Sequence, residues 1–226
     1  GTDSASHSGA ITVGILNKTD AGSLALGGAN AIGNLAIQGG KVAVSSASNL
    51  NGASSAVIFA ASGTDPVTGA ANTATLQIAG TMDTGAFAFT SAGTVQVDGS
   101  NVATLNVAPT GTGLVHKTGP GVMKVASDLS ASATLAGINV DAGTLYVQSG
   151  KAPNAPIQIA SGAALQLAGV DESAESEVTS ALTVQAGGSI VVDANVEVGR
   201  ALAVTTTYTF DTNDGYYKNG AARIAW

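Results

Sequence analysis

The sequence predicts an all-β protein built as a β-solenoid, a chain wound into stacked coils of short strands. Pairs of apolar residues separated by one small or polar residue recur along most of the 226 residues. This period of two is typical of strands with one buried face, and no stretch sustains a helical period. Hydrophobic residues make up 45% of the chain and charged residues only 10%. An ordinary globular domain has about 25% charged residues, so a long regular rod with an uncharged surface fits better.

The apolar pairs mark the predicted strands in chain order. Before the middle of the chain they are Leu24/Leu26, Leu35/Ile37, Val42/Val44, Val57/Phe59, Leu76/Ile78, Phe87/Phe89, Val95/Val97 and Leu105/Val107. After it they are Ile157/Ile159, Leu165/Leu167, Leu182/Val184, Ile190/Val192, Val196/Val198 and Leu202/Val204.

Short strands at this spacing are compatible with a sandwich, a barrel or a solenoid. The connections Ser45 to Ser55 and Ala60 to Thr75 are too long for the tight hairpins of a sandwich. A solenoid with roughly 20 to 30 residues per coil fits better, because equivalent apolar residues then stack from coil to coil. We expect roughly seven to ten coils and a rod about 40 Å long.

The stretch from Leu114 to Val147 contains the clearest internal repeat. A run at Lys117 to Val125, KTGPGVMKV, is followed by VDAGTL at Val140 to Leu145. An upstream copy begins at Lys18, 99 positions earlier, and presents the same order of elements with Asp20-Ala21-Gly22 in place of Gly-x-Gly. We therefore interpret the chain as a repeat architecture.

These motifs resemble the autotransporter-associated β-strand repeat, whose pattern runs roughly K-T-G-x-G-x-L-x-L, a polar stretch, then V-x-x-G-x-L. Together the two copies cover roughly a third of the chain. The resemblance implies a right-handed parallel β-helix from the passenger region of a large secreted or surface-anchored bacterial protein, often an adhesin. It supplies no catalytic residues.

Two stretches interrupt the strand pattern, and both are predicted to be loops that project from a coil. Gly63 to Gly69 carries Pro and Gly, and Val170 to Glu177 carries four carboxylates, Asp171, Glu172, Glu175 and Glu177. Beyond Val204 the chain becomes rich in aromatic residues, namely Tyr208, Phe210, Tyr216, Tyr217 and Trp226. We therefore predict coils over 1–204 and a cap or divergent end element over 205–226.

Charge and composition exclude several functions. With a net charge of −7 and scattered Lys and Arg, the chain has no basic stripe for nucleic acid or anionic lipid. No apolar run is long enough to span a bilayer, so we expect no membrane-embedded part. Cysteine is absent, which suits a chain that crosses an outer membrane unfolded. Gly1 begins the chain without a signal peptide, and we expect an internal or mature segment.

A catalytic β-helix needs clustered ionisable groups on an outward strand face. The outward position lies between the members of each apolar pair, and among these residues only Lys124 and Glu197 are ionisable. The predicted outward residues are Ala25, Ala36, Ala43, Ile58, Gln77, Ala88, Gln96, Asn106, Lys124, Asn139, Tyr146, Gln158, Gln166, Thr183, Val191, Glu197 and Ala203. We therefore predict no catalytic residues and expect the Gln and Asn side chains to form ladders.

No cofactor or metal site is predicted either. His116 is interpreted as a solvent-facing turn histidine, because His7 is the only other histidine and Cys is absent. Asp211 to Gly215 is one residue short of a calcium loop and is read as a turn. The four carboxylates are read as a solvated loop, and the aromatic C-terminus as a cap rather than a sugar-stacking surface.

Three functional hypotheses follow. The first is a non-catalytic stalk and presentation region of a protein that is extracellular or attached to the bacterial cell surface. It would contact a host protein or glycan through the loops Thr64–Gly69 and Asp171–Glu177. The second is a self-associating matrix, sheath or fibre subunit, favoured by the uncharged face and open coil ends. The third, disfavoured by the outward residues, is a carbohydrate-active enzyme.

Overall fold

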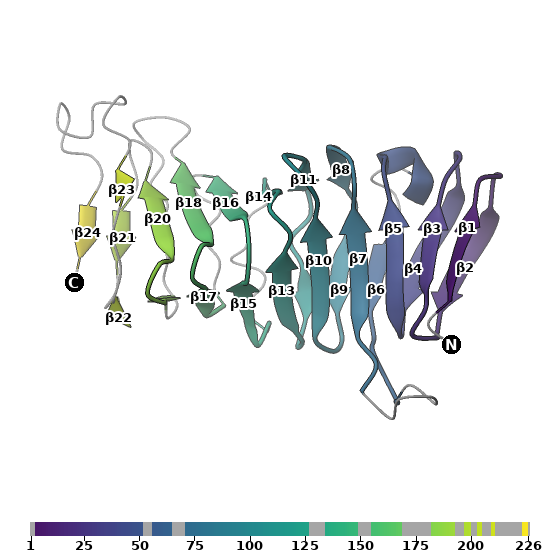
Figure 1. The fold of residues 1–226 in the computed structure, drawn as a ribbon, viewed down its shortest axis with the longest axis horizontal. Helices are drawn as coiled ribbons and strands as arrows, with labels where there is room; N and C mark the ends of the chain where they lie inside the picture. Colours follow the sequence, from purple (N-terminus) through teal and green to yellow (C-terminus); the bar gives the residue numbers. More distant parts are fainter. Residues whose placement is uncertain are drawn as a thin grey trace.

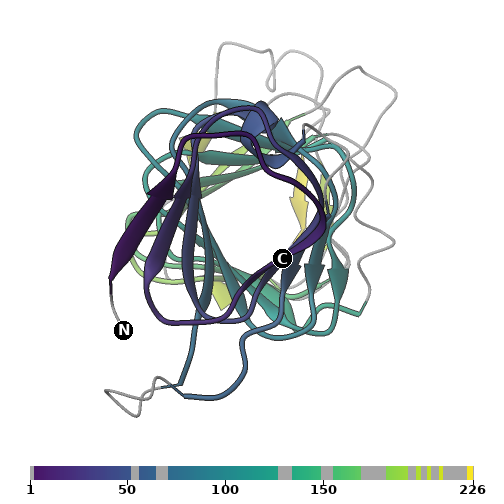
Figure 2. The ribbon, with the colours of Figure 1, turned by 90° about the vertical axis from the view of Figure 1, so that its right-hand side faces the viewer.

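The computed structural model is a β-solenoid whose strands lie side by side along one long axis, with β1 and β24 at opposite ends (Figure 1). It describes residues 3–51, 56–64, 71–126, 134–148, 155–168, 182–192, 197–199, 203–204, 209–210 and 223–225. Viewed along the axis, the ribbon encloses a central space that the inward side chains fill (Figure 2). The all-β solenoid expected from the sequence is confirmed.

One sheet runs along the length of the rod and contains ten strands. In spatial order these are β1 (Ser4–His7), β3 (Ser23–Leu26), β5 (Gly40–Val44), β7 (Ala74–Ile78), β10 (Gly93–Val97), β13 (Leu114–Thr118), β15 (Gly137–Val140), β17 (Ile157–Ile159), β19 (Leu182–Val184) and β22 (Ala203–Val204).

Three further sheets complete the described strands. The five-stranded sheet contains β12 (Thr110–Gly111), β9 (Phe87–Phe89), β6 (Ala56–Phe59), β4 (Ala31–Ile37) and β2 (Thr12–Lys18). The seven-stranded sheet contains β23 (Thr209–Phe210), β20 (Ser189–Val192), β18 (Ala164–Ala168), β16 (Thr144–Gln148), β14 (Val122–Val125), β11 (Val102–Leu105) and β8 (Met82–Thr84). The two-stranded sheet contains β21 (Glu197–Gly199) and β24 (Arg223–Ala225).

All pairings between the described strands are parallel, which excludes the hairpins of a sandwich. Leu24 pairs with Val42, 18 residues further on, and Ile157 pairs with Leu182, 25 residues further on. One coil is longer, because Gly40 pairs with Ala74 and the chain between them holds η1, β6 and the loop after Ser62. Ten strands spaced by about 4.8 Å give the long sheet a span of roughly 43 Å.

The second face of the rod changes along its length. From β1 to β6 the chain alternates between the ten- and five-stranded sheets, whereas from β13 to β20 it alternates between the ten- and seven-stranded sheets. The coils containing β7 to β12 contribute strands to all three sheets. Lys18 in β2 and Lys117 in β13 therefore lie on different sheets, although the two segments share an order of elements.

The core is the stack of inward residues predicted from the apolar pairs. In β7 and β10, for example, Leu76, Ile78, Val95 and Val97 are fully buried. Two assignments are wrong: Val107 lies beyond the end of β11 and is 45% exposed, and Ala36, placed outward, is buried in β4.

Three phenylalanines pack together in the described core. Phe59 and Phe89 occupy paired positions of β6 and β9, and their rings stack with centroids 4.4 Å apart. Phe87 meets both rings edge-on. Across the coil, a Cβ at Gly93 would lie 2.6 Å from a ring carbon of Phe59, so glycine there makes room for the aromatic stack.

A buried asparagine pair closes a corner of the first coils. Asn30 accepts a hydrogen bond from the backbone of Ile11 and donates to the carbonyl of Asn49. Asn49, in the 3₁₀ turn η1 (Ala47–Leu50), donates to the carbonyl of Gly28 and accepts from the backbone of Ser45. These amides satisfy main-chain groups that strand pairing does not reach at the corner.

At the C-terminal end, β23 pairs in parallel with β20, as the preceding strands of that sheet do. Of the end element predicted over 205–226, only β23 and β24 are described, and Tyr208, Tyr216, Tyr217 and Trp226 lie outside the described residues. Within the described residues no helix is long and apolar enough to cross a membrane.

Truncating the aromatic stack tests the packing of the core. We expect Phe59→Ala to lower the free energy of unfolding by about 3–5 kcal/mol, because it removes a fully buried ring and leaves a cavity. The neighbouring outward residue Ile58 provides the control, since Ile58→Ala should cost less than about 1 kcal/mol. Urea titration of the unmodified chain and the two variants measures both changes in the free energy of unfolding. Equal decreases in the two variants would contradict this packing.

Candidate functional site

From β7 to β19, the outer face of the ten-stranded sheet carries a row of polar side chains, none of which is Lys, Arg, Asp or Glu; the same position on the preceding strand β5 is Lys41. Strand register places Thr75, Thr94, His116, Asn139, Gln158 and Thr183 side by side on successive strands. Each is partly or fully exposed. We call these six residues the polar row.

The two ionisable residues predicted at outward positions belong to strands of different sheets. Lys124 lies on β14 of the seven-stranded sheet, and its ammonium is 5.3 Å from the centre of the Tyr146 ring on the next strand. Glu197 belongs to β21 of the separate two-stranded sheet.

The predicted ladder of Gln and Asn side chains differs at Gln77 and Gln96, whose amides bind a carboxylate rather than each other. Gln77 and Gln96 face each other on β7 and β10, but both side-chain amides donate to the carboxylate of Asp98. The Gln96 hydrogen bond is 2.7 Å long. The carboxylate at the strand end thus holds two coils in register on the outer surface.

His116 is not a turn residue, contrary to the sequence interpretation. It lies within β13, and its Nδ1 is 2.7 Å from a carboxylate oxygen of Asp141, which follows β15 in the next coil. About a third of the His116 side chain is exposed, and Asp141 is similarly accessible. The orienting partner that the sequence did not reveal lies 25 residues away along the chain.

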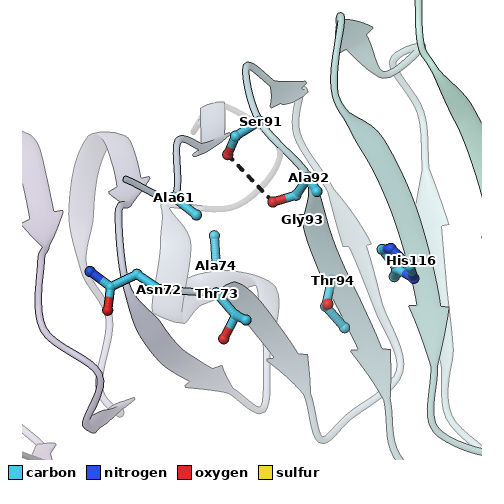
Figure 3. Close-up of a pocket in the computed structure, with 9 residues that line it drawn as sticks. All are labelled: Ala61, Asn72, Thr73, Ala74, Ser91, Ala92, Gly93, Thr94 and His116. Atoms are coloured by element: carbon cyan, nitrogen blue, oxygen red, sulfur yellow. Dashed lines mark hydrogen bonds between the residues drawn. The ribbon is translucent and has the colours of Figure 1, made fainter. Parts of the chain in front are cut away.

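A groove of about 360 Å³ opens beside His116, at the start of β7 and β10 (Figure 3). Small residues form part of its lining: Ala61, Ala74, Ala92 and Gly93. The polar lining residues are Asn72, Thr73, Ser91, Thr94 and His116. The Ser91 hydroxyl lies 3.4 Å from the carbonyl of Ala92, and the Asn72 amide donates to the carbonyl of Ser62.

Lys117 is the most unusual charged residue among those described, because it points into the core. Val115 and Lys117 share the inward face of β13, and Lys117 is fully buried. Its ammonium donates three hydrogen bonds of 2.7–3.0 Å to the carbonyls of Thr118, Gly119 and Ala142. Since Ala142 belongs to the next coil, Lys117 joins two successive turns.

Lys18 does the same at the equivalent point of the upstream copy. It is 8% exposed, and its ammonium donates to the carbonyl and carboxylate of Asp20 and, at 3.2 Å, to the carbonyl of Gly39 in the next coil. The hydrogen bond from Lys18, helped by its charge, lowers the pKa of Asp20. A buried lysine therefore connects adjacent turns in both copies, although the two lie on different sheets.

The glycines of the central motif are required by the close approach of these turns. Gly119 has φ of +73°, and a Cβ there would lie 2.4 Å from the carbonyl oxygen of Val97 in the preceding coil. Gly143 has φ of +69°, and a Cβ there would lie 2.4 Å from the carbonyl oxygen of Gly119 and 2.7 Å from the Lys117 ammonium. Side chains are thus excluded sterically and by backbone conformation.

Several predicted loops lie wholly or partly outside the described residues. Asp171, Glu172, Glu175 and Glu177 are among these, as is the turn at 211–215. Of the loop Thr64–Gly69 only Thr64 is described, and an antiparallel bridge joins it to Ala71 at the base of the loop. This base adjoins the groove, because Ala61 and Asn72 both line it.

Comparisons with protein-family models, curated proteins and solved structures find no match to this chain. The fold and the chemistry of the described residues therefore provide the basis for a functional proposal.

Removing the buried lysine tests its electrostatic cost. Burial lowers the pKa of Lys117 from 10.5 to about 8, so between these values the unfolded chain binds more protons than the folded chain. The free energy of unfolding should therefore rise from about pH 8 to pH 10.5, by up to about 3 kcal/mol from this residue. We expect Lys117→Met to lack this increment.

Urea titrations of both proteins between pH 7 and pH 10.5 measure the difference. Parallel pH profiles for the two proteins would contradict the burial of a charged Lys117, whatever the absolute stability of the variant.

Proposed function

We propose that the chain is a non-catalytic stalk and presentation region of a secreted or surface-anchored bacterial protein that acts in adhesion. The observation that carries this proposal is the stack of parallel coils, in which the described core residues run from Leu26 in β3 to Val184 in β19. Such a stack is a semi-rigid rod, which holds whatever its surface presents away from an anchoring point.

The outer surface supports a presenting rather than a catalytic role. His116 is hydrogen-bonded to Asp141, but the other residues lining the adjacent groove are small or carry only hydroxyl or amide groups. The resemblance of the Lys117 and Val140 motifs to the autotransporter-associated repeat supports an exported setting, as does the absence of cysteine. In this proposal the loops at Thr64–Gly69 and Asp171–Glu177 contribute to partner contact.

Retention on a host-like surface tests the adhesion role. Microspheres coated with the chain should remain on epithelial cells or extracellular matrix under flow several-fold longer than uncoated spheres, and an excess of the soluble chain should abolish this retention. No retention on any such surface would contradict adhesion. Cleavage of a glycan that is lost in His116→Ala would contradict the non-catalytic assignment.

A second candidate function, a self-associating fibre or matrix subunit, is favoured by the edge formed by β1 and β2. These strands lie at the edges of the ten- and five-stranded sheets, and between Ser4 and Asn17 they carry no Lys, Arg, Asp or Glu. Val13 and Ile15 on β2 are 37% and 60% exposed. Where uncharged strands with exposed apolar side chains are left unpaired, they readily pair with strands of another chain.

Sedimentation velocity at several concentrations tests this second function. If the edge mediates association, the sedimentation coefficient should rise with concentration and Ile15→Lys should prevent the rise, because it places a charge on the edge. Val107→Lys provides the matched control, since Val107 is an exposed apolar residue away from that edge. A monomer at all concentrations would exclude self-association.

A further inference from the structure

Two separate grooves open along the polar row. The first, described above, is bordered by Thr94 and His116. The second, of about 300 Å³, is bordered by Asn139, Gln158 and Thr183, three coils further along the same sheet. Because all five side chains belong to one row of aligned strand positions, the grooves lie one after the other in the direction of the rod axis.

The lining of both grooves is electrically neutral in its composition. None of the residues lining either groove is Lys, Arg, Asp or Glu, and the polar groups are hydroxyls, amides and one imidazole. Hydroxyls and amides both donate and accept hydrogen bonds, so they match a ligand that carries many hydroxyl groups. A charged ligand would find no opposite charge in the lining to offset its desolvation.

Small and apolar residues supply the rest of each lining. Ala61, Ala74 and Gly93 contribute to the first groove, and Gly137, Pro156 and Ile157 to the second. A ligand that fits both surfaces is polar at its edges and has apolar C–H faces, as a pyranose ring does.

His116 is held in a fixed orientation at the end of the first groove. When the imidazole is neutral, the hydrogen bond between Nδ1 and the Asp141 carboxylate places the ring proton on Nδ1 and leaves the lone pair on Nε2. Among the described residues, no protein group forms a hydrogen bond with Nε2. The oriented ring therefore offers an acceptor for a hydroxyl group, close to Thr94 on the neighbouring strand.

We propose that the polar row binds a linear neutral glycan that lies along the rod and occupies both grooves. His116 accepts a hydroxyl hydrogen in the first groove, Thr94 donates or accepts beside it, and Asn139 and Gln158 serve the second groove. Asp141 is a positioning residue that acts through His116. This inference goes beyond the adhesion proposal, since it assigns a ligand class to a strand face rather than to the loops.

Calorimetry and saturation-transfer NMR with defined oligosaccharides test the proposal. The probes are cello-, malto- and chito-oligosaccharides, each as a disaccharide and a hexasaccharide, with oligogalacturonate as the charged comparison. At least one neutral hexasaccharide should bind at least about tenfold more tightly than its disaccharide, because it reaches both grooves. Thr94→Val and His116→Phe should each weaken its binding by about three- to tenfold, the contribution of one hydrogen bond.

Two further variants complete the design. Ala92→Trp should prevent binding in the first groove, because Ala92 is exposed and a large ring there covers the lining without entering the core. Thr104→Val, on the outer face of the seven-stranded sheet, should bind like the unmodified chain. Thermal unfolding confirms that each variant is folded.

Three results would overturn the proposal: no binding of any neutral oligosaccharide, equal affinity for the disaccharide and the hexasaccharide, or loss of affinity in Thr104→Val as large as in Thr94→Val. Preferential binding of oligogalacturonate would overturn the neutral ligand class. The oligosaccharide binding test does not use the retention of coated microspheres. The glycan proposal can therefore fail while the adhesion proposal stands, and the reverse.

Discussion

The stacking of inward side chains on their equivalents in the next coil is the constraint on which this molecule depends. A coil of about 20 residues cannot bury its own apolar residues, so each coil relies on the ones above and below it. Parallel pairing keeps equivalent residues at the same height on successive strands, as Leu76, Val95 and Lys117 are in the ten-stranded sheet. The rod shape follows from this repetition.

The corners between strands present a second requirement, since main-chain carbonyls there are buried without strand partners. Amides meet this requirement in the first coils, through Asn30 and Asn49, and the ammonium groups of Lys18 and Lys117 meet it elsewhere. A lysine suits a site with three converging carbonyls, because its ammonium has three protons to donate. Its aliphatic stem can meanwhile pack among the core residues. The cost is desolvation of the charge, which lowers the pKa of Lys117.

Much of the fold could be predicted from the apolar pairs, because the alternation of buried and exposed residues is local. The inward position of Lys117 was missed, since a charged residue interrupts the apolar pattern, although Val115 two residues earlier marks the same face. The contact between His116 and Asp141 could not be predicted, because it depends on how two coils align. The change from the five- to the seven-stranded sheet likewise reflects the stacking of whole coils rather than any single segment.

The same regularity shapes the functional proposals. Because equivalent strand positions are aligned from coil to coil, inward side chains form a continuous apolar stripe and outward side chains form a straight row. The polar row and its grooves therefore follow from the register of the strands. Asparagine, glutamine, threonine and histidine at that position from β7 to β19 produce a polar surface with one oriented imidazole, which ends at Lys41 on β5. The predicted loop at Thr64–Gly69 starts beside this surface, so the loop and the groove can act on the same partner.

The register of the coils can be measured most directly with paired spin labels, because the chain contains no cysteine of its own. Thr75 and Gln158 occupy the same row four strand steps apart, through Thr94, His116 and Asn139. Cysteines introduced at these two positions and labelled should give a single narrow distance distribution, consistent with a backbone separation of about 19 Å. A broad distribution, or one centred at more than twice that separation, would contradict the stacked parallel coils.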